Sequence, residues 1–319
     1  MDLHEPTPGL AGGPAAARDP SAGSGSPEPV SVPATAPAEP PAPGSATART
    51  SRTGRNLPVA IAVGLGLGAF VPLTLFTVKS TFLLWMGLAV ALAIWELDRA
   101  LRPREVRLPL VPLYAGGTAL WTLAYWLGYK SAFGALALTA IAIFGWRLHG
   151  PAAGYLRDVT AGMFTLAWLP LGGMFVALML TEPDGDRRVF IFVVVTICSD
   201  IGGYFAGISF GKHLFAPQIS PKKTWEGLAG SAFGCLVAGG ALVPAMIHHG
   251  HWWQGLLLGA AVVTVAFLGD LAESMIKRDL GIKDMGSLLP GHGGVLDRID
   301  AMLLSAPVTW VVLVAFFPR

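Results

Sequence analysis

Charged and polar residues of this largely apolar chain gather in two stretches, 199–227 and 269–300. In the second stretch, Asp270, Glu273 and Lys277 are spaced so that they share one face of a helix. A carboxylate inside an apolar span is costly unless a partner or a water-filled cavity stabilises its charge. A structural ion pair between helices could explain one such residue alone. Several of them beside a second polar stretch instead indicate a functional site.

The loop that follows Lys277 mixes glycines with residues of both charges. Its glycines let the backbone approach a ligand and offer N–H groups to anionic oxygens. Its bases could neutralise phosphates while its acids hold a divalent cation. The charged candidates are Lys277, Arg278, Lys283, Asp284, His292, Asp297, Arg298 and Asp300. A positively charged membrane anchor would need only the bases, so the pattern favours a phosphate ligand accompanied by Mg²⁺.

A second candidate for phosphate binding is the segment Ser220–Gly227, which reads S-P-K-K-T-W-E-G. Lys222 and Lys223 lie between hydroxyl side chains, and Thr224 is expected to begin a helix whose N-terminus favours anions. Taken alone, this segment is better explained as a basic cluster beside a membrane with a helix cap. Asp200, in the apolar run before it, adds a further carboxylate to the region.

The composition is that of a membrane protein: 53% of the 319 residues are hydrophobic, only 13% are charged, and the mean hydropathy is +0.58. Soluble domains carry roughly 25% charged residues. About half that density is too little to cover a globule in water, so the excess apolar residues must face lipid. The net charge of +2 gives no argument for nucleic acid, and no nucleic-acid partner is expected.

Nine apolar runs are long enough, or nearly so, to cross the roughly 30 Å of hydrocarbon for which a helix needs about 20 residues. They predict an all-α, polytopic integral membrane helical bundle with about nine transmembrane helices. The predicted spans are 57–78, 81–98, 109–127, 131–146, 159–181, 189–208, 227–247, 254–273 and 301–317.

Lys and Arg residues are unevenly distributed among the segments that flank these spans. The segment before the first span and the loops after the second, fourth, sixth and eighth are rich in bases. Cytoplasmic loops carry such an excess, so we predict a cytoplasmic N-terminus and a C-terminus outside. Residues 1–56, rich in Pro, Ala, Gly and Ser, are expected to form a disordered cytoplasmic tail. A transmembrane catalytic domain would follow at 57–319.

The stretch from Ser274 to Asp300 closely resembles the signature of the phosphatidate cytidylyltransferases, also called CDP-diglyceride synthases. It reads S-M-I-K-R-D-L-G-I-K-D-M-G-S-L-L-P-G-H-G-G-V-L-D-R-I-D and fits that pattern essentially throughout. The segment Ser220–Gly227 also resembles the family, and Glu96 lies in a similar W-E-L context. The chain departs from many members at Ile208, where they carry Arg, which weakens only the case for an extra phosphate contact there.

The resemblance implies an enzyme of phospholipid biosynthesis that transfers cytidylate from CTP to phosphatidic acid, releasing pyrophosphate, with Mg²⁺. The lipid phosphate is itself the nucleophile, so no catalytic Ser or Cys is required. In-line attack on the α-phosphorus then needs positioning and charge neutralisation. The implied setting is the inner (plasma) membrane, with the site facing the cytoplasm, where CTP is dissolved. A second, monovalent cation and a homodimer are left open.

Individual roles follow from the resemblance together with this chemistry. Metal binding is assigned to Asp270 and Asp297, with Asp200 as a weaker candidate. His292 would contact phosphate or assist proton movement. The catalytic set is Asp270, Asp297, Lys277, Arg298 and His292, and the substrate-binding set is Ser220, Lys222, Lys223, Thr224, Arg278 and Lys283.

Three other interpretations use the same features. A CTP-dependent kinase would phosphorylate a lipid alcohol and release CDP, which product analysis distinguishes. A transporter would bind ions with its intramembrane carboxylates, but it should show repeats and broken helices near the midplane. An inactive lipid-binding scaffold would need neither the glycines nor the interleaved acids and bases.

Overall fold

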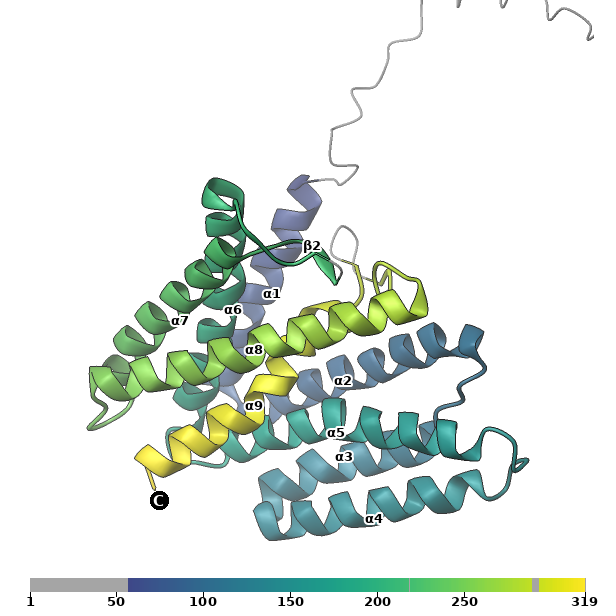
Figure 1. Ribbon diagram of the computed structural model, residues 1–319. Helices are drawn as coiled ribbons and strands as arrows, with labels where there is room; N and C mark the ends of the chain where they lie inside the picture. The colour runs from purple at the N-terminus through teal and green to yellow at the C-terminus, as the bar shows by residue number, and fades with distance from the viewer. Residues whose placement is uncertain (1–56, 218, 289–292, 319) are drawn as a thin grey trace, which may run out of the picture. The chain divides into compact units, whose positions relative to one another are not determined.

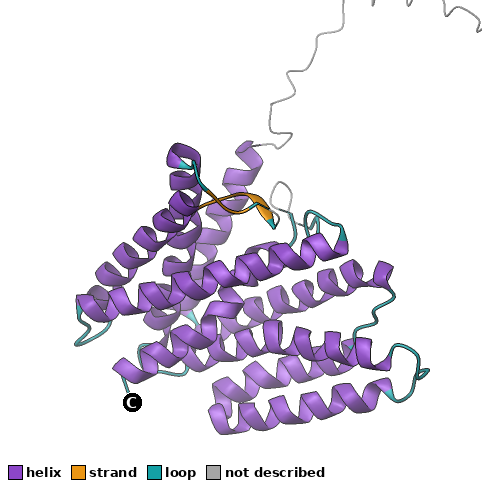
Figure 2. Ribbon diagram, viewed as in Figure 1, coloured by secondary structure: helices purple, strands orange, loops and turns teal. Residues whose placement is uncertain are grey.

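The computed structural model describes residues 57–217, 219–288 and 293–318, so the predicted tail at 1–56 lies outside the described residues. Within those ranges the chain forms nine α-helices and one short hairpin (Figures 1 and 2). The helices are α1 (Leu57–Thr77), α2 (Lys79–Leu101), α3 (Leu110–Leu127), α4 (Tyr129–Arg147), α5 (Tyr155–Leu180), α6 (Gly185–Phe210), α7 (Trp225–Met246), α8 (Trp252–Leu280) and α9 (Leu296–Phe316).

Each predicted span coincides with one of these helices, which confirms an all-α membrane fold. Seven of the described helices, α2 and α4 to α9, are long and apolar enough to cross a bilayer. The protein is therefore a polytopic membrane protein, while the count of nine spans stays a prediction. The largest difference is in α8, which continues beyond the predicted end at residue 273 to Leu280. The helix therefore carries Asp270, Glu273 and Lys277 on one continuous face.

The hairpin was not among the expected elements. A 3-10 turn (Arg102–Arg104) follows α2, and strands β1 (Leu214–Ala216) and β2 (Ser220–Thr224) pair antiparallel between α6 and α7. β1 has only three residues and β2 is polar, so neither strand carries the apolar alternation that would reveal it in a sequence. β2 leads directly into α7 and so brings the predicted S-P-K-K-T segment to the start of that helix (Figure 2).

Small residues let α6, α7 and α8 pack closely. A Cβ atom on Gly202 would overlap the carbonyl of Gly230 across the α6–α7 contact, and one on Gly239 would overlap the carbonyl of Gly255 across the α7–α8 contact. Small residues are a usual means of close helix packing in a membrane. The close packing holds the C-terminal part of α6, which carries Asp200, against α7, and α7 in turn against α8.

The centre of the bundle is α5, which is the most buried of the candidate spans. It contacts α2, α3, α4 and α9, and α9 packs in turn against α8. Leu169, Met174 and Met179 of α5 are fully buried. This arrangement supports α9 from both sides, so the start of α9 lies beside the C-terminal part of α8.

Asp158, at the start of α5, is a structural carboxylate. It is 1% exposed and accepts hydrogen bonds from the backbone N–H of Arg107, at 3.1 Å, and from Nε of Arg147, at 2.8 Å. We expect Asp158→Ala to lower the free energy of unfolding by about 3 kcal/mol, because it leaves a nearly buried guanidinium without its counterion. Thermal unfolding in detergent measures this, with Glu105→Ala as an exposed control. Equal effects of the two changes would contradict the prediction.

Candidate active site

Lys277 connects two acids near the C-terminal end of α8. Its Nζ lies 2.6 Å from Oε2 of Glu273, one helical turn earlier, and 3.0 Å from Oδ1 of Asp297, near the start of α9. Both carboxylate side chains are only 4% exposed. Nearly buried acids of this kind are stable only when a cation or several donors compensate their charge. The ammonium group of Lys277 is thus the shared counterion of the two helices.

Asp297 also organises the loop between α8 and α9. One oxygen, Oδ2, accepts the N–H of Gly294 at 2.9 Å and that of Met285 at 3.1 Å. Backbone N–H groups from both arms of the loop therefore converge on one carboxylate. These N–H groups and Lys277 all contact Asp297, so Asp297 attaches the loop between α8 and α9, here called the signature loop, to the bundle.

The hairpin adds a second ion pair. Nζ of Lys223 in β2 lies 2.7 Å from Oδ2 of Asp270 in α8, and it also lies 5.7 Å from the centre of the Phe267 ring. About two turns further along α8, Nε of Arg278 donates to the carbonyl of Ile219 at 3.2 Å. These contacts fasten the S-P-K-K-T segment against α8. Two stretches that are separate in the sequence therefore form one site.

Acids from three helices meet at this point. Asp200 of α6, exposed at the surface, is close enough to Asp270 of α8 and Asp300 of α9 for their charges to interact, and Lys223 and Arg298 lie within the same range. Asp300 is 7% exposed and lies close enough to Glu273 for the two side chains to interact. The predicted site residues of α6, α8, α9 and β2 thus converge.

The remaining predicted residues lie around this cluster. Lys222, Lys283 and Arg298 are exposed at its surface. Ser220 pairs with Ala216 in the hairpin. His292 lies outside the described residues, so its predicted role stays a prediction.

Thr224 has a local structural role as the N-cap of α7. Its Oγ1 accepts the N–H of Gly227 at 3.1 Å. We expect Thr224→Ala to lower the free energy of unfolding by about 1 kcal/mol, and Thr224→Ser to retain most of it, because serine keeps the acceptor. Thermal unfolding of the two variants measures the difference. If Thr224→Ala also raises KM for CTP and Thr224→Ser does not, the predicted role of the hydroxyl on the nucleotide side gains support.

The carboxylates fit a divalent cation only in part. Among the residues that the structure describes, no group of three or more His, Cys, Asp and Glu side chains is arranged to hold a metal ion. The oxygens of Asp297 already accept from two N–H groups and from Lys277. Asp200 is exposed, as is half of the Asp270 side chain. Mg²⁺ commonly uses one or two carboxylates and completes its shell with water and substrate phosphates, so Asp200 and Asp270 fit such an ion.

From the sequence, Glu96 was named only for its W-E-L context and was given no role in the site. It is 1% exposed in α2, and its Oε2 accepts the N–H of Leu296, the first residue of α9, at 2.8 Å. The signal available in the sequence was an acid near the end of an apolar run, where a carboxylate requires a partner. Glu273 and Asp300 were noted as acids of this region, but the sequence did not indicate that their side chains interact.

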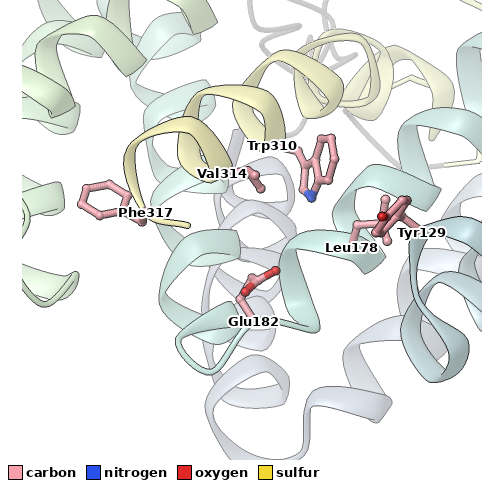
Figure 3. A pocket seen from close by; sticks show the side chains of 6 residues that line it. All are labelled: Tyr129, Leu178, Glu182, Trp310, Val314 and Phe317. Carbon is pink, nitrogen blue, oxygen red and sulfur yellow. The ribbon is translucent and has the colours of Figure 1, made fainter. Parts of the chain in front are cut away.

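The cavity shown in Figure 3 is separate from this cluster. It has a volume of about 290 Å³ and is lined by Tyr129, Leu178, Glu182, Trp310, Val314 and Phe317. Its α9 residues begin at Trp310, about 20 Å along the helix from Asp297 at 1.5 Å per residue. Its lining is mostly apolar and its one charged residue, Glu182, is an acid, so these residues offer no base to the phosphates of a nucleotide.

A polytopic helical body with a charged, glycine-rich cluster at the ends of its apolar helices defines a membrane enzyme that handles anionic groups. The sequence profile of the cytidylyltransferase family matches residues 58–316. The phosphatidate cytidylyltransferase of Mycobacterium leprae is 41% identical over 265 residues, covering 77% of this chain and 83% of that protein. That of Pseudomonas aeruginosa is 34% identical over 249 residues, covering 71% and 85%. The chain therefore belongs to the cytidylyltransferase family and is a nucleotidyltransferase.

Proposed function

We propose that this enzyme transfers cytidylate from CTP to phosphatidic acid, forming CDP-diacylglycerol and pyrophosphate for phospholipid synthesis. The relatives at 34% and 41% identity are named for phosphatidate as the acceptor. The observation that carries the proposal is the convergence of Lys223–Asp270 with Glu273–Lys277–Asp297 at the ends of apolar helices. A cluster in that position can receive a soluble nucleotide and a lipid headgroup together.

The chemistry needs no covalent intermediate. An anionic oxygen of phosphatidic acid attacks the α-phosphorus of CTP, a new P–O bond forms, and the bond from the α-phosphorus to the bridging oxygen of the β-phosphate breaks. Pyrophosphate leaves with that electron pair and takes any proton from solution. In such displacements the protein contributes alignment and charge neutralisation.

The bases of the cluster would supply this neutralisation. Lys277 and Lys223 already face acids of α8 and α9, and Arg278 and Arg298 extend the positive charge along the same helices. We assign them to the phosphates of CTP and of the lipid. Asp200 and Asp270 would hold Mg²⁺, which neutralises phosphate charge when it is bound. The glycine-rich loop, fixed by Asp297, would lie against the nucleotide.

We further propose nine spans with the N-terminus and the site on the cytoplasmic side of the inner membrane. The arginines between α2 and α3, and Arg147 and Arg157 at the facing ends of α4 and α5, support this orientation, because basic segments beside spans remain cytoplasmic. Arg104, after α2, donates to the backbone carbonyl of Asp279 at the end of α8, so basic residues and the site share one end of the bundle. Labelling of single cysteines placed in these loops, with a reagent that does not cross membranes, tests the orientation.

The direct test uses the purified full-length protein in detergent with CTP, phosphatidic acid and Mg²⁺. The proposal predicts CDP-lipid and pyrophosphate in equal amounts, both dependent on phosphatidic acid. Release of CDP with a lipid alcohol as acceptor would instead establish a kinase. A well-folded protein that forms no product, assayed beside an active phosphatidate cytidylyltransferase, would refute the proposal.

A further inference from the structure

Glu96 reaches the signature loop from a distant part of the chain. It belongs to α2, and the residue whose N–H it accepts, Leu296, lies 200 positions later. The side chain is 1% exposed, and α2 packs directly against α9. A carboxylate buried to this extent must be compensated by donors or charges at short range. It is therefore a defined contact between the N-terminal helices and the site.

The loop backbone closes around this carboxylate. A Cβ atom on Gly286 would overlap the Glu96 carboxylate at Oε1, and one on Gly294 would lie against Oε2. Glycine is thus required at both positions for the loop to approach Glu96. The Glu96 carboxylate fills the space that these two glycines leave.

The same loop segment holds Asp297. The N–H of Gly294 donates to Oδ2 of Asp297, and Leu296, the partner of Glu96, immediately precedes Asp297. Asp297 in turn contacts Lys277. A displacement of the loop away from Glu96 would therefore also move Asp297, which accepts a hydrogen bond from Lys277.

The second carboxylate oxygen of Glu96, Oε1, differs from Oε2 in its hydrogen bonding. Oε1 is buried and has no hydrogen-bond partner among the described residues. A group chosen only to stabilise the fold would gain more from an apolar side chain of similar size, because an unsatisfied buried oxygen is costly. Its position against Gly286 supports a role in placing the loop.

We propose that Glu96 is a positioning residue for the transfer reaction, which fixes Gly286, residues 293–296 and the start of α9 so that Asp297 and Lys277 keep their positions. The inference rests on the proposed function. Glu96 touches backbone atoms and no reacting group, so it acts through the loop. Misplacement of a reacting group by about 1 Å reduces rates by roughly 10²-fold, which sets the size of the expected effect.

The kinetic test compares Glu96→Leu, Glu96→Gln and the matched control Asp98→Asn. Asp98 is on the same helix, is 3% exposed and pairs with Arg102 at 2.6 Å. We expect Glu96→Leu to lower kcat about 10²-fold with unchanged thermal unfolding, and Glu96→Gln, which keeps an acceptor for Leu296, to recover a large part of the loss. Asp98→Asn should retain kcat. Full activity of Glu96→Leu, an equal loss in Asp98→Asn, or a loss that follows unfolding would overturn the proposal.

A second readout needs no catalysis. Met285 is in the loop and 5% exposed, so a cysteine placed there, in a chain with Cys198 and Cys235 replaced by alanine, should react slowly with a water-soluble maleimide. Glu96→Leu should raise this rate about tenfold by releasing the loop, and Asp98→Asn should not. An unchanged rate would refute the positioning role. Because labelling uses no substrate, a wild-type protein inactive on phosphatidic acid would refute the proposed function separately.

Discussion

Asp297→Asn is expected to lower kcat for CDP-diacylglycerol formation by about 10²- to 10³-fold, the size seen when a preorganised electrostatic contact is removed. The Asp297 carboxylate accepts the N–H groups of Met285 and Gly294 and pairs with Lys277. An amide has one acceptor and would point an N–H₂ group at donors. Both the loop and the position of Lys277 would then change.

The measurement is the steady-state rate at saturating CTP and phosphatidic acid, with thermal unfolding recorded for the same preparation. Asp184→Asn is the matched control, because Asp184 forms an ion pair with Arg188 at 2.7 Å before α6, in the α5–α6 connection. The control should keep its activity. A rate for Asp297→Asn close to that of the wild type would show that the carboxylate is dispensable.

Lys277→Met is expected to affect both activity and stability. Without the ammonium group, the nearly buried carboxylates of Glu273 and Asp297 lose the counterion that they share. This loss should lower the free energy of unfolding by about 3 kcal/mol. We also expect a loss of about 10³-fold in kcat/KM, because a charge assigned to substrate phosphate disappears. Lys277→Arg keeps the charge but changes its geometry, so its activity should lie between those of the wild type and Lys277→Met.

A double variant separates the two effects. Adding Glu273→Gln to Lys277→Met removes one of the two uncompensated charges, so part of the lost stability should return. The stability effects of substitutions at contacting residues are commonly non-additive in this way. Activity should remain as low as in the single variant. Recovery of activity together with stability would mean that Lys277 serves the fold alone.

The helical framework could be predicted because a membrane span carries its own signal, a run of about 20 apolar residues. The continuation of α8 to Leu280 was less evident, because its last turns contain charged residues and no longer resemble a span. The hairpin at β1 and β2 was missed for a related reason, because its five- and three-residue strands have no apolar period. In each case the missing signal is hydrophobic contrast.

For the site, sequence spacing predicted that Glu273 and Lys277 share a helical face, and the structure confirms their contact. Spacing could not predict that the Asp297 carboxylate would accept hydrogen bonds from loop N–H groups. Nearly every residue has a backbone N–H group, so residue types do not show which of them donates. Nor could spacing pair Glu96 with Leu296, because nothing local relates positions 200 residues apart. Contacts within one helix were thus accessible from sequence, and contacts between distant elements required the fold.

The fate of isotope from CTP distinguishes cytidylate transfer from phosphoryl transfer. The purified protein would be incubated with phosphatidic acid, Mg²⁺ and CTP carrying ³²P in either the α- or the γ-phosphate, and the lipid would then be extracted. If the enzyme transfers cytidylate, α-label enters the lipid fraction and γ-label remains in aqueous pyrophosphate. Entry of γ-label into lipid, with α-label left in aqueous CDP, would exclude cytidylate transfer and establish phosphoryl transfer.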